Sequence, residues 1–311
     1  NGDVRLRMFD LEKNRDTLAA IDIHPSDSDR FVCLSTTHLA YIQSLQILDR
    51  VMAATSLDLV MDEEIRKRVM EGKIREVGAP SGVNAEQLLN LHPEIFFTYP
   101  FGDLQTELIE RSGTRCIEVS EYLEQDPLAR AEWVKFFGYV CGKGEASEQL
   151  FSSIRDAYLS APVDTSVQKK RVLFVSTDGQ YWYAPPGNSF IGHLLHDAGL
   201  DYVFADSLSN GNIIMDREQL LAAGAGCDAL GIIGGFPDGM NQVIFDQQFP
   251  QVTLPCVEAG KVFYCNTATT DYFGKAVIEP QVLRNDLMHL FNADHTDDSN
   301  TTYFRILTSG Y

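Results

Sequence analysis

The stretch Glu145–Ala161, EASEQLFSSIRDAYLSA, separates two parts of the chain that show the same kind of pattern. Its apolar residues recur at the spacing of one helical face, and Pro162 follows it. These residues are Leu150, Ile154, Ala157, Tyr158 and Ala161. The spacing predicts a helix about 25 Å long. Taken alone, the pattern also fits an ordinary amphipathic core helix, but the sequence on either side favours a connection between two lobes.

Composition limits the classes of protein to consider. The 311 residues include 44 acidic and 25 basic side chains, for a net charge of -19, which argues against a nucleic-acid partner and against an anionic membrane surface. The sequence contains no run of about 18 apolar residues, so it predicts no membrane-spanning helix. The six cysteines lack metal-binding spacing, so buried free thiols are expected, with one disulfide in the second half as the alternative.

Strands and helices alternate on both sides of the predicted connecting helix, whereas residues 1–30 give no clear prediction. Before it, strands are expected at residues 30–34, 50–54, 74–77, 94–98 and 116–119, with helices between them. After it, strands are expected at residues 171–175, 202–204, 229–233 and 262–264. Such alternation is typical of parallel sheets covered by helices. We therefore predict an α/β protein with an N-terminal lobe (1–144), a connecting helix (145–161) and a C-terminal lobe (162–311).

A short repeat supports two lobes of similar build. Asn84-Ala-Glu-Gln-Leu-Leu89 precedes an apolar strand in the first half, and Asp216-Arg-Glu-Gln-Leu-Leu221 precedes one in the second. Asn84 and Asp216 are each expected to cap a helix. A Ser-Thr pair also follows the first predicted strand of each half.

Several stretches together resemble one family over nearly the whole chain, namely the extracytoplasmic substrate-binding proteins of ABC importers for metal chelates. The stretches are Leu34–Tyr41, Gly78–Glu94, Asp126–Gly138, Tyr183–Ser189 with Asp197-Ala-Gly199, and Ile278–Leu283. The middle stretch resembles versions from gut-type Bacteroidetes. This resemblance implies two Rossmann-like lobes joined by one rigid helix, with a ligand cleft between the lobes. It also implies a periplasmic monomer with a lipid-anchored mature N-terminus, whose ligand is a ferric siderophore, haem or cobalamin.

In the family that this chain resembles, one glutamate on each lobe docks onto arginines of the permease. By motif these residues are Glu86 and Glu218, each two positions after its capping residue. The alternative is a helix-start glutamate that is favoured by the helix dipole alone. Two such carboxylates favour docking, because paired charges set orientation as well as attraction.

Ligands of open α/β sheets bind beyond the carboxyl ends of the strands. The loops expected there are rich in aromatic rings, which suit flat conjugated ligands, although some rings are expected merely to anchor loops. With His38, the predicted ligand-binding residues are Tyr41, Tyr99, Phe101, Tyr181, Trp182, Tyr183, Phe236 and Tyr272. These loops contain no arginine, which favours cobalamin, haem or a near-neutral ferric hydroxamate over a triply charged ferric catecholate.

Individual residues leave alternatives open. His38 is expected either to contact the chelate or to form a structural hydrogen bond, and Tyr99 would be an axial ligand if the chelate were haem. An α/β enzyme using Ser35, Thr36 and His38 is a rival prediction, but no G-x-S-x-G motif surrounds them. A free zinc or manganese receptor of the same architecture is a second rival. Apart from the bound chelate, we predict no cofactor and no resident metal.

Overall fold

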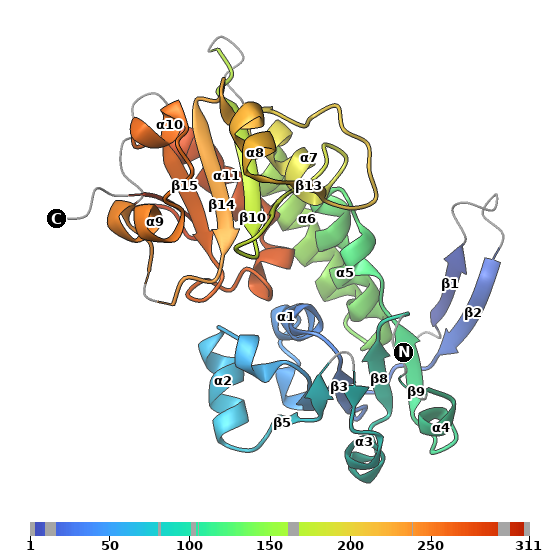
Figure 1. The fold of residues 1–311 in the computed structure, drawn as a ribbon. Coiled ribbons are helices and arrows are strands. Elements are labelled where there is room, and N and C mark those ends of the chain that lie inside the picture. Colours follow the sequence, from blue (N-terminus) through green and yellow to red (C-terminus); the bar gives the residue numbers. More distant parts are fainter. Residues whose placement is uncertain are drawn as a thin grey trace. The chain divides into compact units, whose positions relative to one another are not determined.

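The structure of the chain is a computed structural model that describes residues 4–9, 17–79, 82–100, 104, 106–160, 168–237, 239–291 and 299–307 (Figure 1). It divides into two compact units. Unit 1 comprises residues 1–121 and 132–153, and unit 2 comprises residues 122–131 and 154–311. Helix α6 (Gly144–Ser160), which corresponds to the predicted helix at residues 145–161, contributes residues to both units. Residues 122–131, predicted within the N-terminal lobe, are instead part of unit 2.

Unit 1 contains a five-stranded parallel sheet in the order β5-β4-β3-β8-β9. Its strands are β3 (Phe31–Cys33), β4 (Val51–Ala54), β5 (Arg75–Glu76), β8 (Ile95–Thr98) and β9 (Arg115–Glu118). The helices of this part of the chain are α1 (Thr36–Ser44), α2 (Glu63–Met70), α3 (Ala85–Leu91), α4 (Thr106–Glu110) and α5 (Pro127–Val140). Two antiparallel pairs accompany them, β1 (Val4–Phe9) with β2 (Thr17–Ile23), and β6 (Gly78–Ala79) with β7 (Gly82–Val83). Three 3₁₀ helices are η1 (Leu48–Arg50), η2 (Leu57–Leu59) and η3 (Glu121–Leu123).

Alternate residues of β3 and β8 pack into different layers, as expected for a sheet covered on both faces. Val32 and Phe96 pack in a cluster that includes Leu88 of α3 and Ile109 of α4. The other layer is aromatic. Its ring contacts are Phe31 with Phe97, Phe97 with Phe137 of α5, and Phe137 with Tyr41 of α1.

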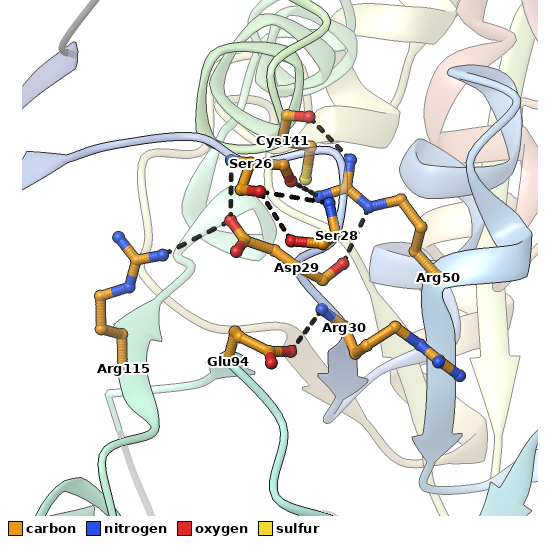
Figure 2. Close-up of polar contacts among 8 residues, drawn as sticks. All are labelled: Ser26, Ser28, Asp29, Arg30, Arg50, Glu94, Arg115 and Cys141. Carbon is orange, nitrogen blue, oxygen red and sulfur yellow. Dashed lines mark hydrogen bonds and ion pairs between the residues drawn. The ribbon is translucent and has the colours of Figure 1, made fainter.

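A buried arginine joins three segments of unit 1 (Figure 2). The Arg50 guanidinium donates to the main-chain oxygens of Asp29 (2.8 Å), Cys141 (2.9 Å) and Ser26 (2.5 Å). It also lies over the Phe31 ring. Arg50 thereby ties the start of β4 to the turn before β3 and to the carbonyl that follows α5, where a cation is favourable.

Unit 2 contains a seven-stranded mixed sheet. The order is β13-β11-β10-β14-β15-β16, and β12 pairs with β10. Its strands are β10 (Arg171–Thr177), β11 (Trp182–Ala184), β12 (Asp201–Tyr202), β13 (Ile213–Met215), β14 (Ala229–Gly234), β15 (Val262–Asn266) and β16 (Phe304–Ile306). Its helices are α7 (Phe190–Asp197), α8 (Arg217–Gly224), α9 (Gln242–Gln248), α10 (Pro255–Glu258), η4 (Lys275–Ile278) and α11 (Pro280–Phe291). Strands β12, β10, β14 and β15 are parallel, and β11, β13 and β16 are antiparallel to their neighbours.

A hydrophobic layer lies on each face of this sheet. Leu173 and Val175 of β10 pack with α8, α9 and α10, whereas Val172 and Phe174 pack with α6, α7 and α11. Gly231 lies in β14 where a Cβ atom would come within 2.5 Å of the rings of Phe174 and Phe263. Only glycine fits there without displacing those rings.

The predicted fold class is confirmed, and the main strands and helices lie within a few residues of their predicted bounds. The short strands β11, β13 and β16, the helices α9 and α10, and the β1–β2 pair were not predicted. Short strands are hard to predict because their pairing depends on distant neighbours. All six cysteines are free thiols, so the predicted alternative of a disulfide is wrong. Among the described residues, no helix is both long and apolar enough to cross a membrane.

Candidate functional site

Each sheet has a topological switch point at its first parallel strand, where the strands that come next along the chain lie on opposite sides of it. In unit 1, β3 has β4 on one side and β8 on the other; in unit 2, β10 lies between β12 and β14. At such a point the loops after neighbouring strands diverge and leave room for a ligand. The predicted site residues follow the strands at these two points.

In unit 1 the polar residues after β3 form the N-cap and the first turn of helix α1. The Ser35 side chain accepts a hydrogen bond from the Thr37 backbone N–H at 3.2 Å, which makes Ser35 the N-cap. The Thr37 hydroxyl donates to Oε1 of Glu121 at 2.5 Å. Ser35 and Thr37 therefore have structural partners within unit 1.

His38 and Tyr41 lie in the core of unit 1, and each has 0% exposed surface. The His38 ring contacts the rings of Phe97, Tyr99 and Phe137. Burial lowers the pKa of the His38 imidazole to about 4, and the nearby Glu121 opposes this with a smaller effect. His38 is therefore neutral at pH 7, and neither residue presents a surface to a ligand.

Tyr99 follows β8 and is only partly buried. Its ring lies 5.2 Å from that of His38, and its hydroxyl donates to Oε1 of Glu121 at 3.4 Å. Of the predicted unit 1 aromatics, Tyr99 is the one with a partly exposed side chain in the described residues; Phe101 lies outside them.

The enzyme alternative needed a hydrogen bond between Ser35 and His38. The Ser35 hydroxyl instead pairs with Thr37, and neither ring nitrogen of His38 has a hydrogen-bond partner among the described residues. The nucleophile–base pair that this alternative requires is therefore not assembled.

In unit 2 a tight turn orders the aromatic residues after β10. The Asp178 carboxylate accepts hydrogen bonds from the backbone N–H groups of Gln180 and Tyr181, both at 2.8 Å, and from the Tyr183 hydroxyl at 2.6 Å. These bonds, led by that from the Tyr181 N–H, lower the pKa of Asp178 to about 2. Tyr181 is 41% exposed, so Asp178 holds an exposed tyrosine in a fixed turn. The sequence contains an Asx-turn signal here, Asp178-Gly179, whose role we did not predict.

A hollow of about 330 Å³ lies at the carboxyl ends of β10 and β14. Its lining contains no charged side chain. The lining residues are Thr177, Gly179, Ile233, Gly234, Gly235, Phe236, Gln248 and Phe249. Thr177 and Gln248 supply polar groups, while Phe236 and Phe249 supply apolar surface, so the hollow suits an uncharged and partly apolar group.

Asn266, at the end of β15, fixes the backbone beside this hollow. Its side chain accepts from the Phe236 N–H at 2.9 Å and donates to the Phe236 carbonyl at 2.8 Å. Asn266 is buried. This two-way bond holds Phe236 in place, and it was not predicted because it joins residues 30 positions apart.

The other predicted aromatics of unit 2 are dispersed around the strand ends. Trp182 is only 8% exposed and packs against Phe249, which lines the hollow. Tyr272 is half-buried and packs against Phe273 and the opposite face of the sheet. Gln248 and Phe249 were missed, although Asn241 before an apolar run is a helix-start signal that would have located α9.

Glu86 and Glu218 each occupy the second position of a helix and are exposed. Asn84 caps α3, accepting from the Gln87 N–H at 3.0 Å. Asp216 and Gln219 form a reciprocal capping box at α8. The repeated motif therefore gives the same local structure twice.

Metal-binding groups do not converge in the part of the chain that the structure describes. It contains no cluster of three or more His, Cys, Asp or Glu residues placed to hold a metal ion. The structure has two α/β units, and in unit 2 a partly apolar hollow lies beyond the strand ends, which is an arrangement typical of ligand-binding proteins.

The sequence profile of the periplasmic binding protein family matches residues 32–268, so the chain belongs to that family. The matched residues therefore form a binding-protein region rather than an enzyme domain. A curated relative, the uncharacterized lipoprotein MJ0878 of Methanocaldococcus jannaschii, is 25% identical over 247 residues, covering 78% of this chain and 58% of the relative. A second, MJ0642 of the same organism, is 21% identical over 126 residues, covering 40% of this chain and 34% of that protein. The chain thus spans less than two thirds of each.

Solved structures of binding proteins share the fold. The catecholate-siderophore binding protein VctP from Vibrio cholerae has a TM-score of 0.68 at 14% identity, covering 92% of this chain and 99% of that one. The siderophore binding protein BauB, bound to acinetobactin and ferric iron, also has a TM-score of 0.68 at 14% identity, with coverage of 94% and 100%. The periplasmic heme binding protein HutB of Vibrio cholerae has a TM-score of 0.67 at 13% identity, with coverage of 84% and 98%.

Proposed function

We propose that this protein captures a metal chelate outside the cytoplasmic membrane and delivers it to an ABC permease and its ATPase. The observation that carries the proposal is the uncharged hollow at the strand carboxyl ends of unit 2, in a chain of the periplasmic binding protein family. The solved relatives named above bind haem or siderophores. A lipid anchor at the mature N-terminus is part of the proposal, supported by a lipoprotein relative.

The proposed ligand is near neutral where it meets unit 2. A triply charged ferric catecholate needs cationic partners, and the lining of the hollow offers none. Cobalamin, haem and a ferric hydroxamate remain the proposed chelates, with an amide-bearing or macrocyclic edge against Phe236 and Phe249. A free zinc or manganese receptor is disfavoured, because the described residues bring no metal-binding cluster together.

The residues proposed to face the ligand are Tyr99 of unit 1 and four aromatic residues of unit 2, namely Tyr181, Tyr183, Phe236 and Tyr272. His38 and Tyr41 have no exposed surface, and Trp182 packs behind Phe249 rather than lining the hollow, so these three residues are proposed to support the others from behind.

The permease is proposed to bind Glu86 and Glu218. Both carboxylates are exposed, and no ion pair occupies either of them among the described residues. They are therefore available to arginines of a partner, and matched positions on two helices would set its orientation.

The test is a titration of tryptophan fluorescence with cyanocobalamin, hemin and ferric desferrioxamine. Trp182 contacts Phe249 at the hollow, so a bound chromophore is expected to quench it. Saturable quenching by one ligand that shrinks in Trp182→Phe, while calorimetry still detects binding, would support the proposed function. If none of the three binds by calorimetry, the proposal fails for these chelates. The matched control is Trp133→Phe, since Trp133 lies on α5 outside unit 2.

A further inference from the structure

Glu121 is a buried carboxyl group at the start of η3, close to the carboxyl end of β9. It has 0% exposed surface. Removing a carboxyl group from water is costly unless hydrogen bonds compensate. The hydrogen-bond partners of Glu121 therefore indicate its structural role.

Both hydroxyl donors to Glu121 reach the same oxygen. Thr37 donates to Oε1 at 2.5 Å, and Tyr99 donates to Oε1 at 3.4 Å. The other oxygen, Oε2, has no hydrogen-bond partner among the described residues. It faces Nε2 of His38 across 3.9 Å, too far for a direct hydrogen bond.

The His38 ring does not compensate for the buried carboxyl group. Both of its nitrogens also lack hydrogen-bond partners in the described part of the chain, and its burial favours the neutral imidazole. A carboxyl group with only one oxygen bonded is a poor way to stabilise a core, because an apolar side chain of similar size avoids the desolvation cost. What Glu121 does provide is an acceptor 3.4 Å from the Tyr99 hydroxyl, at the long end of the hydrogen-bond range.

We propose that Glu121 is a positioning residue that fixes the direction of the Tyr99 hydroxyl, so that Tyr99 meets the ligand as a hydrogen-bond acceptor. A phenol that gives its proton to a carboxylate cannot give the same proton to a ligand. The ligand group at Tyr99 is then a hydrogen-bond donor, such as a carboxamide N–H, rather than a carboxylate. The inference rests on the proposed function, because it takes Tyr99 as ligand-facing.

The rest of the arrangement restricts the Tyr99 ring. His38 packs against it at 5.2 Å, and His38 is itself held among Phe97 and Phe137. Thr37 anchors Glu121 from the first turn of α1. Ring and hydroxyl are thus both directed from inside unit 1, as a preorganised binding residue requires.

The first experiment uses the ligand-free protein, labelled with ¹³Cζ-tyrosine. Glu121→Met removes the acceptor and keeps an unbranched side chain of similar length, and we expect the Tyr99 resonance, assigned with Tyr99→Phe, to shift. Glu118→Met, an exposed change on β9, is the matched control and should leave that resonance unchanged. A Tyr99 resonance that does not respond to Glu121→Met would overturn the inference.

The second experiment measures binding of cyanocobalamin, ferric desferrioxamine and hemin to a double-mutant cycle. We expect Glu121→Met and Tyr99→Phe each to weaken binding of the amide-bearing ligand by about tenfold, and the double variant to bind no more weakly than Tyr99→Phe alone. Additive losses would mean that Glu121 acts independently of Tyr99 and would overturn the inference. Binding of none of the three to the unsubstituted protein would overturn the proposed function and this inference with it, whereas additivity leaves the proposed function intact.

Discussion

The Tyr183 hydroxyl donates a 2.6 Å hydrogen bond to Oδ2 of Asp178, while Oδ1 of the same carboxylate accepts two backbone N–H groups of the turn after β10. One side chain therefore sets both the turn and the direction of a tyrosine at the strand end. Thr177 reinforces the turn by donating to the Tyr181 carbonyl at 2.8 Å.

Asp178→Ala is expected to loosen the turn and to weaken chelate binding several-fold, because Tyr181 and Tyr183 lose their shared acceptor. Isothermal calorimetry with the chelate that binds checks this. Asp206→Ala, which removes another exposed carboxylate of unit 2, is the control and should bind normally. Unchanged affinity in Asp178→Ala would exclude a role for the turn in binding.

The same turn is expected to withstand mild acid. The folded pKa of Asp178, about 2, lies below its ordinary value of 3.8, so the carboxylate's contribution is present above about pH 4 and is lost as pH falls towards 2. An NMR titration of the Asp178 carboxyl carbon measures this directly. A midpoint near 4 would show that the hydrogen bonds do not persist in solution.

His38 predicts a second pH effect, which lowers the free energy of unfolding on acidification as Asp178 does, but over a higher pH range. Its folded pKa of about 4 is below the ordinary 6.5, so the unfolded chain binds the extra proton between these values and unfolding becomes easier as pH falls through that window. The full effect is about 3 kcal/mol, reached below pH 4. Guanidinium denaturation at pH 7 and pH 4.5 should show most of this loss. The groups facing the imidazole are Glu121 and Tyr99.

His38→Gln is expected to remove most of that pH dependence, whereas His196→Gln, at an exposed position on α7, should retain it. If both variants lose stability on acidification as the unsubstituted protein does, the effect belongs to other groups.

Local signals explain how much of the fold could be predicted. Asn84 and Asp216 begin helices by bonding to residues three positions away, and such caps are legible in sequence. Strands such as β10 and β14 are continuous apolar runs, as parallel strands buried on both faces require. Helix α6 has the apolar spacing from which a helix at residues 145–161 was predicted.

The candidate site was harder to predict because its contacts are distant in sequence. Thr37 forms a hydrogen bond with Glu121, which lies 84 positions further along the chain, and Asn266 forms hydrogen bonds with Phe236, which lies 30 positions before it. His38 was expected near the ligand because it follows a strand. The Ser35 cap starts α1 so early that the His38 ring contacts Phe97 and Phe137 instead.

Arg50→Met is expected to lower the free energy of unfolding of unit 1 by about 3 kcal/mol or more, because three buried carbonyl acceptors lose a charged donor. Arg30→Met is the matched control. Arg30 is exposed, and in Figure 2 its guanidinium points away from the cluster around Arg50. Its replacement should change stability by less than about 0.5 kcal/mol. Equal effects of the two substitutions in chemical denaturation would mean that the Arg50 contacts contribute little.

The final prediction concerns docking. Glu86→Arg together with Glu218→Arg should leave chelate affinity unchanged, because neither residue lines the hollow, and should abolish ATP-dependent uptake with the cognate permease in proteoliposomes. Glu64→Arg with Glu258→Arg, which reverses one helical glutamate in each unit, is the control and should retain uptake. Each single reversal is expected to weaken docking less than the pair. Full uptake by the Glu86→Arg/Glu218→Arg protein would exclude these two carboxylates as the permease contacts, even if chelate binding is confirmed.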